Sequence, residues 1–251
     1  MEQRITSRKN PQIQMVRKLL SSRKYREETG RFVGDGIKLL KEASAYCPGL
    51  ETVFLSDGVE ADLPETVQVI RVPEDVMESI SPMSSPQGAL FVCRMPRQPE
   101  WKPRGGIMIL DGIQDPGNLG TILRTSDALD VPLVLLEGCA DVFNHKVVRA
   151  SMGAVFRREV VQTTWEQVLQ ACKAAQIPIG VTALSDTAMD IRRAQLHTMA
   201  VVIGSEGQGV RPEILEQADQ QLIIPMNAHC ESLNAAVAAT IVMWQMRCTL
   251  P

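Results

Sequence analysis

The stretch LDGIQDPGNLGTILRTSDALD, residues 110–130, ends an apolar run and predicts a strand, a tight polar turn and a helix. Asp115, with a proline directly after it, is typical of the start of a helix. Gly117 and Gly120 allow another group to approach the backbone closely. The expected helix carries one arginine, Arg124, nearly opposite its apolar side chains, which are Leu119, Ile122, Leu123 and Leu129.

Arg124 has a structural and a functional interpretation. An exposed arginine on a helix commonly pairs with a nearby acid, here Asp127, and such a pair contributes little to stability. The glycine-marked DPGN turn in front of the helix favours the other interpretation, in which the guanidinium belongs to a site. The pattern of this one stretch leaves both open.

Five continuously apolar segments after residue 106 predict a parallel sheet that helices cover on both faces. The segments are GIMILDG, VPLVLLE, IPIGVTA, MAVVIGS and QQLIIPM. Helices are expected at Asn118–Leu129, His145–Gly153, Trp165–Ala175, Pro212–Ala218 and from about Ser232 to Arg247. The last of these helices places one stripe against the sheet or a second subunit, and the stripe consists of Leu233, Ala236, Val237, Thr240, Ile241 and Trp244. In such a domain the ligand binds at the carboxyl ends of the strands.

The first third of the chain predicts a smaller α/β domain. A helix with a basic outer face is expected where apolar residues recur at Ile13, Val16, Leu19 and Leu20. A strand, a glycine turn and a helix follow in RFVGDGIKLLKEASAY, then strands in ETVFLSD, VQVIRVP and GALFVCRM and a short helix in PEDVMESIS. The segment RMPRQPEWKPRGG is rich in proline and glycine and predicts a linker. The expected domains are residues 1–97 and 107–251, joined by residues 98–106.

The composition is that of a soluble globular protein, with 45% hydrophobic and 22% charged residues in a chain of 251. The longest apolar runs are too short to cross a bilayer, and MEQRITSRKN has no apolar segment of a secretory signal. The six cysteines form no CxxC pair, and neither they nor the three histidines have the spacing of a zinc site. We therefore expect no metal, no membrane association and reduced thiols in the cytoplasm.

Charge is distributed unevenly along the chain. Residues 1–31 contain nine Lys and Arg against three acidic residues, whereas the remainder has 17 basic and 26 acidic residues. A cationic segment on an acidic body indicates a polyanionic partner that is contacted locally. A solvated helix face is the equally simple alternative.

The stretch VVIGSEGQGVRPE, residues 201–213, is a second glycine-rich turn between a strand and a helix. Such turns commonly bind phosphate, but this one has neither the GxGxxG order nor a following Lys-Ser/Thr pair. Glu206 would repel a pyrophosphate. A neutral or cationic ligand held mainly by backbone groups fits the turn better, and a plain turn with glycine at positive φ is the alternative.

The stretch LIIPMNAHCESLNAAVAATIVMW, residues 222–244, forms a third polar loop after an apolar strand. Ser232 and Asn234 lie at the start of the final helix, where both residue types commonly act as caps. Capping does not explain why three polar loops marked by glycine or small residues all follow apolar strands in the same half of the chain.

Together, DGIQDPGNLGTILRT, VVIGSEGQGV and IPMNAHCESLNAAVAA resemble the three signature motifs of the SpoU (TrmH-like) RNA 2′-O-ribose methyltransferases of the SPOUT superfamily. The resemblance extends from about Gly106 to the C-terminus, and HKVVRASMGAVFR is similar to the family's segment between the first two motifs. The segment from SRKNPQ to LLKEA resembles the substrate-binding domain of many members, which is similar to a small ribosomal protein (L30e-like). It departs from that pattern at Asp35, where the family usually has Glu.

This resemblance implies a C-terminal α/β domain with a mostly parallel sheet and a deep trefoil knot, and a homodimer through the catalytic domain. It implies S-adenosylmethionine as cofactor and methylation of a ribose 2′-hydroxyl in RNA, with ribosomal RNA favoured over transfer RNA. It assigns catalytic roles to Asn118, Arg124, Glu206, Ser232 and Asn234. It assigns cofactor contacts to Gly204, Glu206, Gly207, Ile224, Met226, Ser232 and Leu233. The negative charge of Glu206 suits S-adenosylmethionine, which has a positively charged sulfonium group and no phosphate.

The family motif marks Arg124 as catalytic, either as a base that has become neutral in a closed site or as a charged group that stabilises the developing alkoxide. We favour the charged form, because a guanidinium is normally always protonated. RNA-backbone contacts are expected from Arg8, Lys9, Arg23, Lys24, Arg26, Lys146 and Arg149, and Arg157 and Arg158 extend the candidate surface. Two rival interpretations are a non-catalytic RNA-binding protein with this fold and a nucleotide-dependent α/β enzyme.

Overall fold

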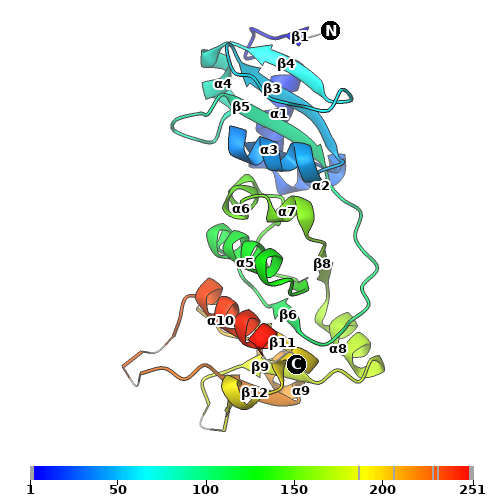
Figure 1. The fold of residues 1–251 in the computed structure, drawn as a ribbon, viewed down its shortest axis with the longest axis vertical. Coiled ribbons are helices and arrows are strands. Elements are labelled where there is room, and N and C mark those ends of the chain that lie inside the picture. Colours follow the sequence, from blue (N-terminus) through cyan, green and yellow to red (C-terminus); the bar gives the residue numbers. More distant parts are fainter. Residues whose placement is uncertain (1–2, 186, 206, 228, 231, 249–251) are drawn as a thin grey trace. The chain divides into compact units, whose positions relative to one another are not determined.

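The computed structural model describes residues 3–185, 187–205, 207–227, 229–230 and 232–248. The chain divides into two compact units, one of residues 1–97 and 141–157 and the other of residues 98–140 and 158–251. Each unit is built on its own sheet, as Figure 1 shows. The predicted α/β fold class with a large parallel sheet in the C-terminal part is confirmed.

The N-terminal unit has a mixed sheet with the strand order β1-β4-β3-β5-β2. The strands are β1 (Gln3–Arg4), β2 (Arg31–Asp35), β3 (Leu50–Ser56), β4 (Gln68–Val72) and β5 (Ala89–Arg94). β5 runs antiparallel to both of its neighbours, and the other pairs are parallel. The helices of this unit are α1 (Pro11–Ser21), α2 (Arg23–Thr29), α3 (Ile37–Tyr46), α4 (Glu74–Ile80), α6 (His145–Ala150) and α7 (Ala154–Arg157).

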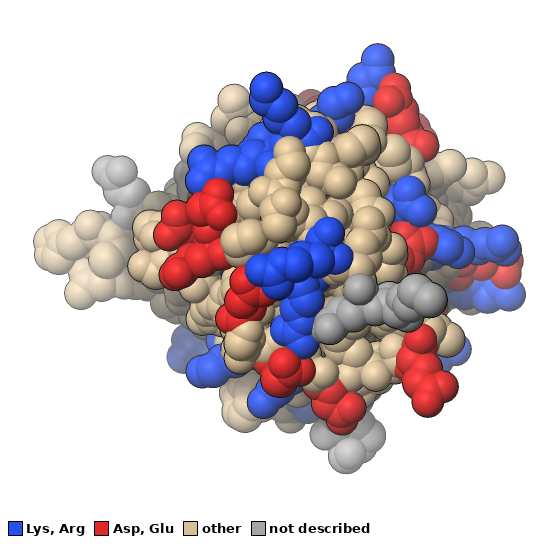
Figure 2. All heavy atoms as spheres, turned by 90° about the horizontal axis from the view of Figure 1, so that it is seen from above, with Lys and Arg blue, Asp and Glu red and all other residues tan. Residues whose placement is uncertain are grey.

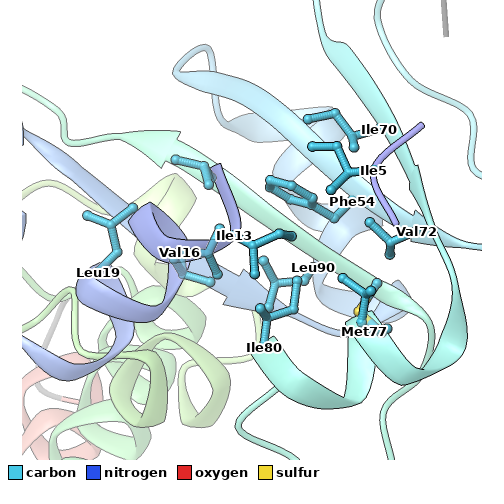
Figure 3. Close-up of a cluster of buried hydrophobic side chains, with 13 residues drawn as sticks. Ile5, Ile13, Val16, Leu19, Phe54, Ile70, Val72, Met77, Ile80 and Leu90 are labelled. Atoms are coloured by element: carbon cyan, nitrogen blue, oxygen red, sulfur yellow. The ribbon is translucent and has the colours of Figure 1, made fainter. Parts of the chain in front are cut away.

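The apolar spacing of the first predicted helix is confirmed by the core of this unit. Ile13, Val16 and Leu19 of α1 are buried against the sheet and α4, and Figure 3 shows Ile13 beside Phe54 and Leu90, with Val16 and Leu19 further along the helix. One long helix through residue 29 does not form, because Ser22 has an extended backbone with φ −126° and ψ 112°. Its hydroxyl accepts a hydrogen bond from the backbone N–H three residues later and so begins α2 as a separate helix.

Segment 141–157 lies in the N-terminal unit, although the predicted domain of residues 107–251 includes it. The rings of Phe143 and Phe156 have their centroids 4.8 and 6.3 Å from that of Phe32 in β2. Arg157 at the end of α7 forms an ion pair with Glu42 of α3. The chain therefore leaves the N-terminal unit after residue 97, returns at residue 141 and leaves again after residue 157, and the exact domain boundaries stay a prediction.

The C-terminal unit has a fully parallel sheet with the strand order β10-β12-β9-β11-β6-β7-β8. The five strands predicted from apolar runs are β6 (Ile107–Leu110), β7 (Leu133–Leu136), β9 (Ile179–Thr182), β11 (Ala200–Ile203) and β12 (Gln220–Ile223). The two outer strands, β8 (Val160–Thr163) and β10 (Met189–Asp190), were not predicted. They lie at the edges of the sheet, where one is partly polar and the other is only two residues long, so neither leaves an apolar signature.

The helices of the C-terminal unit are α5 (Pro116–Leu129), α8 (Trp165–Ala174), α9 (Pro212–Gln217) and α10 (Ala235–Cys248), with short 3-10 turns η1 (Ile191–Arg193) and η2 (Leu196–Thr198). α10 packs against α5. The predicted helix start near Ser232 is wrong by three residues, since the side chain of Asn234 caps α10 by accepting from two of its backbone N–H groups. Ser232 and Leu233 are left in the loop in front of the helix, where they can face a ligand.

The stripe predicted for the last helix needs a correction. The residues that α10 buries are Ala235, Ala236, Ala239, Val242, Met243 and Met246. Val237 and Trp244, which were predicted on the packed stripe, are 48% and 59% exposed. Because α10 is apolar on nearly all sides, its sequence does not show which face is buried in the C-terminal unit and which face is exposed. Among the described helices, none is long and apolar enough to cross a membrane.

Candidate functional site

A cavity of about 550 Å³ opens where three neighbouring strands of the parallel sheet end. It lies at the residues that directly follow β9, β11 and β12, which is the edge where such a sheet binds ligands. Among the predicted cofactor residues, those that line it are Gly204, Gly207, Ile224, Met226, Ser232 and Leu233. The second and third polar loops therefore meet in one pocket, as their resemblance implied.

The described residues that line this cavity include no Lys, Arg, Asp or Glu. Its walls are apolar side chains such as Ile203, Leu222 and Ile224 together with the backbone of the glycine loop. A phosphate group would find no cation there, whereas an uncharged adenosine-like body fits apolar walls and backbone groups. This lining disfavours the nucleotide-dependent alternative.

The glycine loop, which follows the carboxyl end of β11, is folded tightly on itself. Ser205 and Gly209 exchange two backbone hydrogen bonds of 3.1 and 2.9 Å. A Cβ atom on Gly204 would lie only 2.0 Å from the carbonyl carbon of Gly209, so no larger residue fits there without displacing backbone. Gly209 has a φ of +68°, which glycine adopts readily.

Asp111, at the end of β6, fastens the far end of this loop. Its carboxylate accepts hydrogen bonds from the backbone N–H of Arg211 at 2.9 Å and from the Nε of the same residue at 2.7 Å. Asp111 is only 2% exposed, and its own N–H donates to the carbonyl oxygen of Ile203 at 2.8 Å. The first loop thereby fixes both the strand before the glycine loop and the residue after it. The sequence gives no sign of this contact, because its partners are 100 residues apart in the chain.

The first and third loops meet through two asparagines. The Nδ2 of Asn234 donates to the Oδ1 of Asn118 at 3.0 Å, and the Asn118 backbone N–H donates to the Asp115 side chain at 2.7 Å. Asn118 and Asn234 thus connect the start of α5 to the start of α10. Two of the predicted catalytic residues are in direct contact, and Ser232 lies two residues before one of them in the lining of the cavity.

Arg124 is exposed on α5 and does not line the cavity. The pairing with Asp127 that was the structural alternative does not form, and Arg124 has no hydrogen bond or ion pair with any residue that the structure describes. The guanidinium is therefore available to a ligand. Glu206, predicted for both catalysis and cofactor binding, lies outside the described residues.

This fold and these loops match a known family. The model described as the SpoU rRNA Methylase family matches residues 106–244, and the model described as the MRM3-like substrate binding domain matches residues 10–90. The chain belongs to the SpoU rRNA methylase family. The first match contains all three loops and the cavity of the C-terminal unit.

Relatives along nearly the whole chain support this membership. The SpoU-family chain is 34% identical to the 23S rRNA (guanosine(2553)-2′-O)-methyltransferase RlmP of Bacillus subtilis over 97% of its length and 98% of the relative. A crystal structure of an AdoMet-bound rRNA methyltransferase from Sinorhizobium meliloti is similar with a TM-score of 0.86 and 28% identity, covering 99% and 98% of the two chains. A structure described as an RNA 2′-O ribose methyltransferase has a TM-score of 0.82 and 29% identity, covering 98% of each chain.

The basic residues predicted to contact RNA belong to the N-terminal unit of this SpoU-family protein. Those that are exposed are Arg8, Lys9, Arg23, Lys24, Lys146 and Arg149. Arg8 pairs with Asp75 at 2.9 Å and Arg23 with Glu27 at 2.7 Å, but exposed pairs of this kind exchange partners at little cost. Figure 2 shows Lys and Arg interspersed with Asp and Glu over one end of this unit, so charge alone does not delimit an RNA surface.

Arg26 requires a correction, because it is buried. Only 3% of it is exposed, and its Nε and Nη2 donate to the Asp141 carboxylate at 2.8 and 2.5 Å. A third donor, Nη1, bonds the carbonyl oxygen of Leu19 at 2.5 Å. With these donors used inside the unit, Arg26 anchors segment 141–157 and does not face RNA.

Replacing Arg26 with Ala is expected to lower the free energy of unfolding by about 3 kcal/mol, because the Asp141 carboxylate would stay largely buried without its partner. Arg23→Ala on the same helix is the matched control, since it removes an exposed pair and should cost less than about 1 kcal/mol. Urea unfolding of both variants measures the difference. Equal losses would contradict the role assigned to Arg26.

Proposed function

We propose that the protein transfers a methyl group from S-adenosylmethionine to a ribose 2′-hydroxyl of RNA, and that the RNA is ribosomal. The observation that carries this proposal is the glycine-walled cavity, whose described lining has no charged side chain, and the contact between Asn118 and Asn234 that joins it to the helix that holds Arg124. The named activities of the relatives and the bound AdoMet of the Sinorhizobium meliloti protein support it. The match of residues 10–90 to a substrate binding domain supports a substrate that the N-terminal unit also contacts.

The cavity residues fit the cofactor by shape and charge. The sulfonium group of S-adenosylmethionine supplies a methyl group already activated by its positive charge. Ile224 and Leu233 would contact the apolar parts of the donor. Gly204, which has no side chain, would let the donor lie close to the backbone of the glycine loop. By holding the donor in one pose, these residues bring the reacting atoms into line, which alone contributes several kcal/mol to lowering a barrier.

The acceptor side of the reaction belongs to α5 and the loop before α10. Asn118 and Asn234 fix these two elements against each other, and Ser232 at the edge of the cavity offers a hydroxyl to the ribose. Arg124, exposed and charged, stabilises the alkoxide that develops at the 2′-oxygen and grips an adjacent phosphate. A role as general base is the alternative, and it requires a closed site that removes the charge.

Incubation with labelled S-adenosylmethionine and either total ribosomal RNA or transfer RNA tests the proposal. The expected result is incorporation into ribosomal RNA, followed by mapping of a single ribose methylation. Label confined to transfer RNA would contradict ribosomal RNA as the substrate. Label on a base would contradict methylation of the ribose. Tight RNA binding without any label transfer would support the rival interpretation of a non-catalytic RNA-binding protein.

The basic residues of the N-terminal unit are proposed to contact the RNA backbone. Lys9 and Lys146 are exposed and form no ion pair within the part of the chain that the structure describes. Replacing both with Ala should weaken RNA binding and reduce the slope of log K against log salt by about 0.7–0.9 for each lost phosphate contact. A filter-binding salt series measures this slope. Lys173→Ala on α8 is the control, and equal slopes for wild-type protein and the double variant would remove these lysines from the RNA surface.

The protein is proposed to act as a cytoplasmic homodimer through its C-terminal unit, which also holds the knot that the family implies. The exposed Val237 and Trp244 lie seven residues apart on one side of α10, beside the half-buried Ile241. An apolar stripe of this kind fits a second copy of the same helix.

Trp244→Ala is expected to weaken dimerisation roughly 30-fold, as loss of a central aromatic anchor commonly does. Sedimentation equilibrium over a protein concentration series measures the dissociation constant. Tyr46→Ala removes an aromatic of similar exposure, 53% against 59%, from the other unit and should leave the constant unchanged. A Trp244 variant that dimerises like wild-type protein would place the subunit interface elsewhere.

A further inference from the structure

Cys47 and Cys93 are two thiols of the N-terminal unit that the methyl-transfer site does not use. Cys47 is half-buried and directly follows α3, and Cys93 is fully buried in β5. Leu50, three residues after Cys47, is the strand partner of Cys93 in the antiparallel pair of β3 and β5. The turn that contains Cys47 therefore lies beside the strand that contains Cys93.

Short backbone contacts hold this turn on β5. The N–H of Arg94 donates to the carbonyl oxygen of Gly49 at 2.7 Å, and the N–H of Leu50 donates to that of Cys47 at 3.1 Å. A Cβ atom on Gly49 would lie 2.7 Å from the carbonyl oxygen of Arg94, so the chains are as close as glycine permits. The thiols of Cys47 and Cys93 lie near enough to each other here to shift each other's pKa in opposite directions.

Only one of the two thiols is accessible. A cavity of about 310 Å³ opens on this side of the unit, and Cys47 lines it together with Tyr46 and Pro64. Cys93 lies behind it at 0% exposure and does not line the cavity. A small molecule in the cavity would reach the sulfur of Cys47 first and Cys93 only through it.

The pair is also polarised. Interaction with the side chain of Cys93, helped by the backbone at Gly49, lowers the pKa of Cys47 despite partial burial. The same interaction and full burial raise the pKa of Cys93 well above its usual value. Of the two thiols, the accessible one therefore ionises more readily, and the thiolate is the reactive form of cysteine.

We propose that Cys47 and Cys93 are an oxidation site that forms a reversible disulfide when the protein meets a hydroperoxide. The Cys47 thiolate attacks one peroxide oxygen, the O–O bond breaks, and Cys47 becomes a sulfenic acid while hydroxide takes up a proton to leave as water. The Cys93 sulfur then attacks the Cys47 sulfur, the S–O bond breaks, and the thiol proton departs with the oxygen as a second water. Two thiols are oxidised, one peroxide is reduced, and a thiol reductant restores both cysteines.

Peptide mapping of the full-length protein after treatment with hydrogen peroxide tests the site. The expected product is an intramolecular linkage between the peptides that contain Cys47 and Cys93, with the loss of two hydrogen atoms and reversal by dithiothreitol. The linkage would join the end of α3 to β5, so thermal unfolding of the N-terminal unit should shift upward by several degrees. Cys172 is the internal control, because burial raises its pKa to about 11 and it should stay reduced.

Two variants separate the roles of the thiols. Cys93→Ala should leave Cys47 as a sulfenic acid that dimedone captures, and Cys47→Ser should leave Cys93 unreacted. The linked peptide of the wild-type protein decides the question even if the Cys93 variant folds poorly. The proposal is overturned if Cys47 and Cys93 both remain free to alkylate after the exposed Cys230 and Cys248 have been oxidised.

Discussion

Arg124→Lys is expected to reduce the single-turnover rate of methyl transfer by about 100-fold or more while leaving the affinity for S-adenosylmethionine unchanged. Arg124 does not line the cavity, so its replacement should not disturb the cofactor, whereas in the proposed mechanism it stabilises the developing alkoxide and binds the neighbouring phosphate. A lysine keeps the positive charge and loses the planar pair of donors that grips two oxygens at once. The rate with saturating RNA and labelled cofactor measures the first effect, and calorimetry measures the second.

The matched control is Arg193→Lys, since Arg193 is also an exposed arginine of the C-terminal unit but lies outside the three loops. Its rate should equal that of the wild-type protein. Near-normal turnover of Arg124→Lys would show that charge alone suffices there and would remove the guanidinium from the proposed chemistry. Because Arg124 has no partner among the described residues, its replacement should leave the stability of the unit unchanged, and a loss of rate would report on the reaction.

The general position of the site could be predicted from sequence because its signals are local. A polar turn directly after an apolar strand marks the carboxyl edge of a parallel sheet, and two such turns, with Gly204 and Ser232, do line one cavity. Pro212 likewise opens a helix where expected. Each of these features needs only a few neighbouring residues to be recognised.

The contacts that hold the site together could not be predicted in this way. Asp111 and Arg211 form the link between β6 and the end of the glycine loop, yet they lie 100 residues apart, and no local pattern shows that they pair. Arg26 appeared basic and exposed because its buried partner, Asp141, is 115 residues further along the chain. A charged residue on a helix reveals its sign in the sequence, whereas its burial depends on the tertiary fold.

Gly204→Ala is expected to lower the affinity for S-adenosylmethionine roughly 100-fold. The added Cβ atom would lie 2.0 Å from the carbonyl carbon of Gly209 and 2.2 Å from the backbone nitrogen of Val210, so the loop must move by about 1 Å to admit it. Both of those residues line the cavity, and a displacement of this size in a positioned site commonly costs about that factor. Calorimetric titration with the methyl donor and with its demethylated product gives the affinity directly.

Gly207→Ala is the comparison that makes the test specific, because it alters the same loop and the same cavity. A Cβ atom on Gly207 would meet nothing within 4 Å, so its variant should bind the donor nearly as well as the wild-type protein. If both alanine variants lose affinity alike, the loop needs flexibility at every glycine and the close approach at Gly204 is not the cause. If neither variant loses affinity, the sulfonium donor does not bind in the cavity between the second and third loops. The Gly204 variant must displace the backbone that forms the walls of this cavity, so a donor bound there would be affected.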